Sequence, residues 1–312
     1  MKKSILKIFL FVLSIFIFVS IIRYGVYYTI IKNPSYKPYF NSKRSDSICY
    51  IIGSSRIRES FDEKLMMRKI TGKTFHNMGI NALPMNYGLL LANKIISTSK
   101  NNIIFIEVSR FKPYKSPRCY DIFNYSDFNK GLISYYNSIN KTSYYEFKTF
   151  ITDIGEFAFN FFSLNEEFNI INDPSLGITN LANSRIEKSY SGDSSNIVYL
   201  NALDIESINK NEKFNKTSHI EILKTIAHCE EKNTKIIFLL PIAFTSSEEK
   251  KELLPLFNSI PEKNKMIYTE KFLTEICQTK NLCDNVHFNI NGSFIFSNEL
   301  TKEINKLNEK NN

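Results

Sequence analysis

The sequence predicts an α/β protein whose parallel sheet is covered by helices on both faces, in three layers. Short apolar runs at 47–53 and 103–108, with a further strand candidate at 73–79, alternate with amphipathic segments of helical period. The alternation returns late in the chain, where an apolar run at 235–240 precedes a helical segment at 246–257. Strands that alternate with helices form parallel sheets packed between helices, which is the basis of the prediction.

Residues 1–32 predict a membrane anchor. Three lysines precede an apolar run at 8–22, in which Ser14 and Ser20 are the only polar residues. Arg23 follows the run. Flanking Lys and Arg side chains can snorkel, so a span from about Ile5 to Tyr28 is long enough to cross a bilayer, with the N-terminus cytoplasmic. Bulky residues follow the run, which favours an uncleaved signal anchor over a secreted, cleaved protein. Residues 33–46, with prolines and basic residues, predict a linker.

The remaining elements follow from period and capping signals. The 61–70 segment predicts a helix capped by Asp62, and Ser246 or Ser247 is expected to cap the helix at 246–257. Residues 47–111 and 218–312 predict one α/β domain, and 112–217, rich in Phe, Tyr and Asn, predicts an insertion or lid. The further elements are helices at 83–99, 219–231, 270–277 and 292–307 and a strand at 265–269.

Charge and cysteine content exclude some functions. The formal charge is +9, but the lysines are spread along all 312 residues, which disfavours nucleic-acid binding and favours a solvated surface. Attraction to anionic lipid or acidic polysaccharide remains open. The five cysteines have no zinc spacing, and pairing of Cys277 with Cys283 and two separate thiols are both compatible with the sequence.

Two motifs predict acyl transfer through a serine. Gly53, Ser54 and Ser55 end the first predicted strand, and sites of parallel sheets form at the carboxyl ends of strands. We expect Ser55 to be the nucleophile, although Ser54 is an alternative. Asp284 lies three residues before His287, so its carboxylate can orient the imidazole as a general base.

These motifs resemble the SGNH, or GDSL-like, hydrolase superfamily over residues 47–110 and 219–308. Gly53-Ser54-Ser55 matches its Gly-Asp-Ser block, with Ser54 in place of Asp, and Asn77-Met78-Gly79-Ile80-Asn81 matches its second block. Asp284, His287 and Gly292 match the last block. The resemblance implies a flavodoxin-like sheet and an oxyanion hole formed by the N–H groups of Ser55 and Gly79.

One block departs from the family pattern. The family carries a Gly-x-Asn block after its third strand, whereas this chain has Glu107-Val108-Ser109-Arg110. Ser109 or Arg110 is a candidate replacement for the missing Asn as an oxyanion donor. Asn77 and Arg56 are further candidates for substrate binding, although Arg56 is equally expected at a solvated helix start.

The Gly-Ser-Ser block behind an anchor is similar to the anchored D-alanyl-transfer proteins and polysaccharide O-acetylation proteins of this superfamily. That similarity implies an extracytoplasmic serine esterase or O-acyltransferase acting on acyl groups of cell-envelope polysaccharide. It implies an acylated glycan or acyl donor as substrate, a membrane-bound O-acyltransferase as partner, and no metal or organic cofactor. The alternative is a catalytically inactive relative that binds glycan or the membrane partner during envelope assembly.

Overall fold

The computed structural model describes residues 2–32, 47–80, 82–98, 102–112, 189–206 and 214–309. The predicted linker at 33–46 lies outside these residues. So does most of the predicted insertion, at 113–188 and 207–213.

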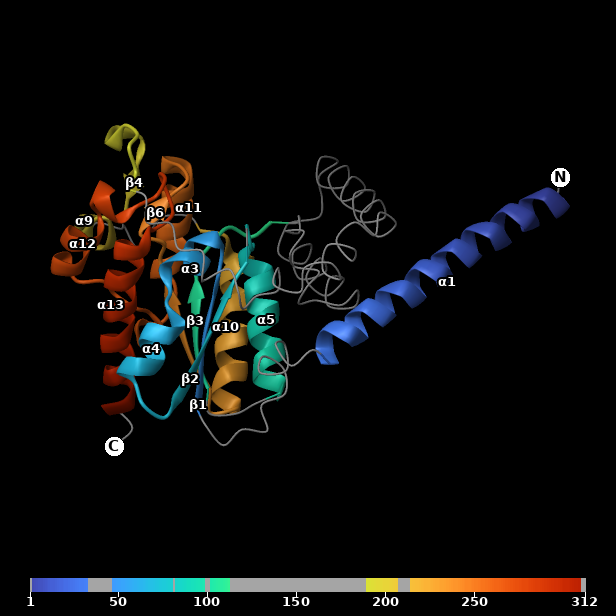
Figure 1. Ribbon diagram of the computed structural model, residues 1–312, viewed down its shortest axis with the longest axis horizontal. Coiled ribbons are helices and arrows are strands. Elements are labelled where there is room, and N and C mark those ends of the chain that lie inside the picture. The colour runs from blue at the N-terminus through green and yellow to red at the C-terminus, as the bar shows by residue number, and fades with distance from the viewer. Residues whose placement is uncertain are drawn as a thin grey trace.

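A four-stranded sheet forms the centre of the molecule (Figure 1). Its strands are all parallel and have the order β2-β1-β3-β5. The apolar runs of β1, β3 and β5 explain their placement, because parallel strands are buried on both faces and require continuous apolar sequence, whereas the edge strand β2 is less apolar. The strand bounds are β1 Ser47–Gly53, β2 Lys73–Gly79, β3 Ile103–Glu107 and β5 Lys235–Leu239. The prediction of a parallel α/β sheet is confirmed.

Helices cover both faces of the sheet, which gives three layers (Figure 1). On one face, α5 packs against α10, and on the other, α13 packs against α3 and α4. The predicted N-caps are present, because Asp62 accepts from Leu65 N–H and Ser246 accepts from Glu249 N–H. The helix bounds are α3 Ser55–Ser60, α4 Glu63–Lys69, α5 Met85–Thr98, α10 Lys216–Glu231, α11 Ser247–Asn258, α12 Glu270–Ile276 and α13 Ile290–Glu309.

The strand predicted at 265–269 is wrong. The segment makes one isolated parallel bridge, between Phe238 and Lys265. Side chains attach the segment on either side of this bridge, since Asn264 donates to Ile236 O in β5 and the Tyr268 hydroxyl donates to Leu240 O, the residue after β5. A strand pattern in the sequence does not distinguish backbone pairing from this side-chain attachment.

Residues 189–206, which the sequence places in the insertion, pack on the α/β domain. Strand β4 (Val198–Tyr199) pairs with β6 (Ala243–Phe244) in an antiparallel ribbon, and the short helix α9 (Ala202–Glu206) follows. Leu200 is completely buried. Short 3-10 turns complete the described chain, η4 at Ser194–Asn196, η5 at Glu262–Asn264 and η6 at Thr279–Asn281.

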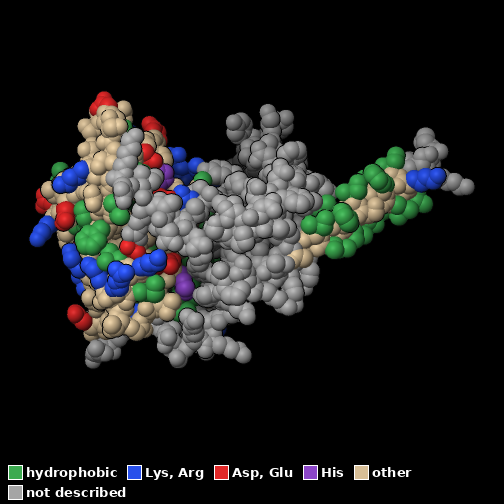
Figure 2. All heavy atoms as spheres, viewed as in Figure 1, with side chains coloured by type: hydrophobic (Ala, Val, Ile, Leu, Met, Phe, Trp, Pro, Cys, Tyr) green, Lys and Arg blue, Asp and Glu red, His purple; other side chains and the backbone are tan. Residues whose placement is uncertain are grey.

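The N-terminal helix α1 (Lys2–Lys32) carries apolar side chains that face outward (Figure 2). Large hydrophobic residues such as Ile8, Phe11 and Phe18 are about two-thirds exposed, at 64–65%. Over the described residues, no helix reaches the length and apolarity needed to cross a membrane. The membrane anchor stays a prediction.

Glu63 covers an exposed edge of the sheet. Strand β2 is an edge strand, and the outward N–H of Asn77 donates to the Glu63 carboxylate. Burial raises the pKa of Glu63 to about 7. The hydrogen bond from Asn77 lowers this pKa, and the negative charge of neighbouring Asp62 raises it further. The folded state therefore holds the Glu63 proton more tightly than the unfolded chain does.

We predict that Glu63 makes the protein less stable as pH rises. Because its folded pKa lies above the unfolded value, its contribution to stability is complete below about pH 4.5 and is lost as pH rises through about 7. Glu63→Gln keeps an acceptor for Asn77 N–H without a buried charge. At pH 8 the variant should be more stable than the wild type by about 1–3 kcal/mol, and at pH 4.5 the difference should vanish. Urea unfolding of both proteins at the two pH values measures it, and an equal difference at both would contradict the account.

Candidate active site

Ser55, His287 and Asp284 form a hydrogen-bonded chain. The Ser55 hydroxyl lies 2.7 Å from His287 Nε2, and His287 Nδ1 lies 2.7 Å from Asp284 Oδ2. Ser55 is the first residue of α3, directly after β1, whereas the other two lie in the loop between η6 and α13. The structure thus brings together three residues that are up to 232 positions apart in the sequence.

The loop of Asp284 and His287 is organised by the Asp side chain itself. Asp284 Oδ1 accepts hydrogen bonds from the N–H groups of Val286 and His287, which leaves Oδ2 for the imidazole. Burial alone would raise the pKa of Asp284, but these hydrogen bonds and the His287 ring lower it to about 2. Asp284 is therefore ionised at neutral pH, which places the imidazole proton on Nδ1 and leaves Nε2 as an acceptor for the Ser55 hydroxyl.

Packing against α13 fixes this loop in place. Asn289, which follows the loop, donates to the carbonyls of Lys280 and Leu282, which precede it. The two ends of the loop are therefore hydrogen-bonded to each other. At Gly292, an added Cβ would lie 2.3 Å from Asn281 O, which explains why the position after the motif is glycine. These contacts therefore hold the loop that carries His287 in a fixed position.

The nucleophile turn is held by a buried carboxylate at the end of β3. Glu107 is 1% exposed, and its Oε2 accepts from Ser54 N–H at 2.6 Å. Its Oε1 lies 2.6 Å from Arg56 Nε. An added Cβ at Gly53 would lie 2.7 Å from Glu107 Oε2, so only glycine allows the carboxylate to approach this closely. One side chain thus holds both neighbours of Ser55.

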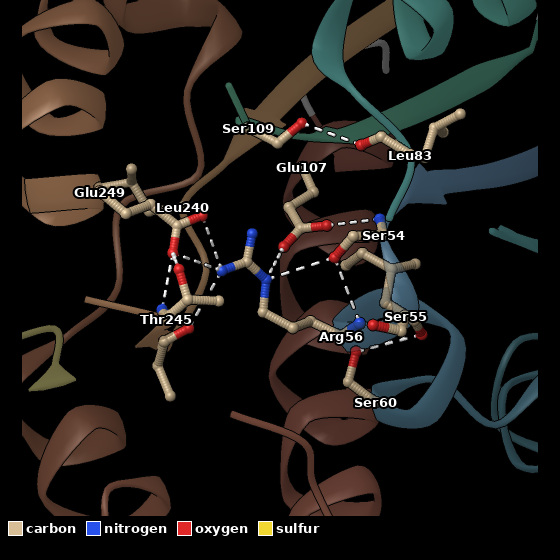
Figure 3. A network of polar contacts seen from close by, with 12 residues as sticks. Ser54, Ser55, Arg56, Ser60, Leu83, Glu107, Ser109, Leu240, Thr245 and Glu249 are labelled. Carbon is tan, nitrogen blue, oxygen red and sulfur yellow. Dashed lines mark hydrogen bonds and ion pairs between the residues drawn. The ribbon is translucent and has the colours of Figure 1, made fainter. Parts of the chain in front are cut away.

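Arg56 lies between two carboxylates, Glu107 and Glu249 (Figure 3). Its side chain is 11% exposed, and Nη1 reaches Glu249 at 3.1 Å. Burial would lower the pKa of Arg56, but the two carboxylates raise it above its usual value. Thr245 completes the network by donating its N–H and hydroxyl to Glu249. Arg56 lines the pocket as a substrate-binding residue would, yet its charge is already matched.

Gly79, expected in the oxyanion hole, is not among the described residues that line the pocket beside Ser55. Its N–H donates to Asn77 Oδ1 at 3.0 Å, and an added Cβ would lie 2.4 Å from Arg58 N. Gly79 is glycine because α3 packs directly on it. Asn77, a predicted substrate-binding residue, is 3% exposed and donates to the carbonyls of Ile57, Arg58 and Phe61. It ties α3 to β2 instead of facing the pocket.

Ala82 lines the pocket in which Gly79 was expected. Ala82 has φ 53°, a left-handed conformation that is uncommon outside glycine, and it lines the same pocket as Ser55 and His287. In the described part of the chain, neither the Ser55 N–H nor the Ala82 N–H donates a hydrogen bond. These two N–H groups are the candidate oxyanion donors. A positive φ at an alanine leaves no signal in the sequence.

The pocket beside Ser55 has a volume of about 220 Å³. Leu83, Pro84 and Val286 form its apolar wall, and Ser109 and Arg110 lie on the wall formed after β3. Ser109, which occupies the place of the family Asn, is 7% exposed and donates to Leu83 O at 3.3 Å. Both residues named as replacement donors therefore line the pocket.

Among the described residues that line the pocket there is no cysteine. Cys277 and Cys283 are both free thiols, which is the second of the two alternatives that the sequence left open. Within the described ranges, no group of three or more His, Cys, Asp or Glu side chains is arranged to hold a metal ion.

Comparisons with known proteins leave the assignment to the site itself. No family model, no curated protein and no solved structure matches the chain.

We predict that Glu107→Gln destabilises the fold much more than Glu252→Gln does. The amide cannot accept from both Ser54 N–H and Arg56 Nε, and breaking a buried ion pair costs about 3–5 kcal/mol. Glu252 pairs with Arg110 but is 55% exposed, so its loss should cost less than about 1 kcal/mol. Urea unfolding measures both values, and equal losses would show that Glu107 does not hold the turn.

Proposed function

We propose that this chain is a serine-dependent acyl-transfer enzyme of SGNH-like type, either an ester hydrolase or an O-acyltransferase. The observation that carries the proposal is the Ser55–His287–Asp284 chain, with both hydrogen bonds at 2.7 Å. Nucleophile, base and orienting acid at hydrogen-bonding distance are the arrangement that activates a serine. The resemblance of the surrounding motifs to the SGNH superfamily supports the same class.

In the proposed mechanism, the Ser55 oxygen attacks an acyl carbonyl while His287 Nε2 takes the hydroxyl proton. Asp284, ionised at neutral pH, stabilises the resulting imidazolium. The N–H groups of Ser55 and Ala82 face the developing oxyanion. His287 then returns the proton to the departing alcohol, which leaves an ester on Ser55. Water or a sugar hydroxyl, deprotonated by His287, attacks that ester and restores the free serine.

The proposed setting is the outer side of a membrane, with helix α1 as the anchor and a cytoplasmic N-terminus. The exposed apolar side chains of α1 support this location, since water is a poor solvent for them. The proposed substrates are acyl groups of cell-envelope polysaccharide, transferred beside a membrane-bound O-acyltransferase. These last two elements rest on the resemblance to anchored D-alanyl-transfer and O-acetylation proteins.

A second candidate is a catalytically inactive protein that binds glycan or the membrane partner. Ser109 favours it, because it stands where the family carries an oxyanion-donating Asn and already donates to Leu83 O. Loss of one oxyanion donor typically lowers kcat by about 100- to 1,000-fold. The two candidates differ in whether Ser55 reacts at all.

We predict that the purified full-length chain hydrolyses p-nitrophenyl acetate and that Ser55→Ala and His287→Ala each abolish this activity. Removing the nucleophile or the base leaves only residual catalysis, so the loss should be at least about 1,000-fold. Ser54→Ala is the matched control. It should retain most of the activity, because His287 Nε2 is hydrogen-bonded to Ser55 and the Ser54 hydroxyl oxygen instead accepts from Arg56 N–H.

Equal rates for wild type and Ser55→Ala would contradict the assignment of the nucleophile. Loss in Ser54→Ala but not in Ser55→Ala would transfer that role to Ser54. A wild type without activity above background would favour the second candidate or a transferase that requires its own donor.

We also predict that Asp284→Asn lowers kcat by about 100- to 10,000-fold with little change in KM. The amide presents its NH₂ or a neutral oxygen to His287 Nδ1 and no longer holds the required tautomer or stabilises the imidazolium. Steady-state kinetics with p-nitrophenyl acetate, together with thermal unfolding, measures the effect. A loss that appears only in KM would assign Asp284 to substrate binding instead.

A further inference from the structure

Helix α4 and the first turns of α13 carry an exposed surface that is both apolar and basic. Figure 2 shows Lys and Arg side chains beside hydrophobic ones over these helices. Phe294 is 50% exposed, Met67 43% and Ile290 37%. With three exposed basic residues, they form a surface that we call the α4–α13 patch: Lys64, Met67, Arg68, Lys69, Ile290 and Phe294.

Contacts between the two helices make the patch one continuous surface. Lys69 Nζ lies 5.3 Å from the centre of the Phe294 ring, so a cation of α4 sits on an aromatic face of α13. Lys64 and Arg68 are four positions apart on α4, and Ile290 and Phe294 are four positions apart on α13, so each pair projects from one side of its helix. Apolar and basic groups therefore point outward together.

The patch carries a net positive charge. Among the described residues, neither Lys64 nor Arg68 has an ion-pair partner. The carboxylates on the neighbouring helical turns already have partners of their own: Glu59 pairs with Arg58, Glu63 accepts from Asn77 N–H, and Glu299 pairs with Lys302. An anionic surface that meets the patch is thus attracted by charges that are not already matched.

This composition fits a lipid surface better than a protein partner. Lysine is depleted at protein–protein interfaces, whereas surfaces that bind membranes combine aromatic and aliphatic groups with Lys and Arg facing anionic headgroups. The chain length allows the contact as well. Residues 33–46 separate α1 from β1 and extend over at most about 50 Å, so a bilayer that holds α1 is within reach of the domain.

We propose that the α4–α13 patch docks on the headgroup region of an anionic lipid bilayer, with Phe294 inserted among the headgroups and the basic side chains around it. The proposal goes beyond the acyl-transfer chemistry and depends on the proposed membrane location, because α1 brings the bilayer within reach. Ile290 lies only three positions after His287. The docked domain therefore holds the loop of Asp284 and His287 close to the membrane surface.

A single tryptophan tests the contact in the full-length chain. The sequence contains no Trp, so Phe294→Trp places the only one in the patch, and an indole suits a membrane interface. The variant is reconstituted in vesicles of phosphatidylcholine, with or without phosphatidylglycerol. In the anionic vesicles its emission should shift to shorter wavelength and be quenched by brominated acyl chains, and both effects should be much weaker in the neutral ones. High salt should reverse them, because it screens the attraction.

Leu203→Trp is the matched control. Leu203 is 72% exposed on α9, which packs against α11 and lies away from α4 (Figure 1), so its emission should be the same in both kinds of vesicle. Lys64→Gln and Arg68→Gln, each in the Phe294→Trp chain, should lower the ratio of docked to undocked protein by about 5-fold, which is the attraction of one basic residue to an anionic surface. Thermal unfolding checks that these exposed substitutions leave the fold intact.

Equal emission of Phe294→Trp in the two kinds of vesicle would overturn the proposal. A shift that grows with protein concentration in neutral vesicles would overturn it too, because it would assign the patch to a contact between copies of the chain.

Flotation of the same samples separates the patch from the anchor. Flotation with both kinds of vesicle but unchanged emission would retain the anchor and reject the patch. Flotation with anionic vesicles only, lost in Lys64→Gln/Arg68→Gln, would support the patch and reject the anchor. Hydrolysis of p-nitrophenyl acetate tests the proposed chemistry independently of either result.

Discussion

The position of Ser55 depends on the buried carboxylate of Glu107. This group lies at the carboxyl end of β3, accepts from Ser54 N–H and pairs with Arg56, so it fixes the residues on both sides of the nucleophile. Gly53 is the consequence, because a side chain there would occupy the space of the carboxylate. Arg56 also pairs with Glu249, which ties β6 and α11 to the same network. The turn that carries Ser55 and the α/β domain are therefore stabilised together.

Local sequence patterns predicted the features that depend on interactions between residues close in the sequence. Three of the four parallel strands follow from apolar runs, and the Asp62 and Ser246 caps follow from their position before helices. Asp284 and His287 meet because they are three positions apart. The pairing of His287 with Ser55 was inferred from the order of the motifs, although the distance in sequence is 232 residues.

Contacts between distant segments explain what the sequence did not predict. Gly79 was expected in the oxyanion hole, but it is glycine because α3 packs on it. Ala82 lines the pocket instead, with a positive φ that the sequence does not indicate. Arg56 reads as solvated or substrate-binding because its partners Glu107 and Glu249 lie 51 and 193 residues away. The sequence around Lys265 has a strand pattern, yet Asn264 and Tyr268 attach it through side chains.

The central claim is that His287 activates Ser55 for covalent chemistry. The most direct measurement is peptide mapping by mass spectrometry after the full-length protein reacts with a fluorophosphonate, which phosphonylates activated serines. The account predicts one adduct, on Ser55, that forms in the wild type and not in His287→Ala. An unreactive wild type, or an adduct on a different residue, would contradict it.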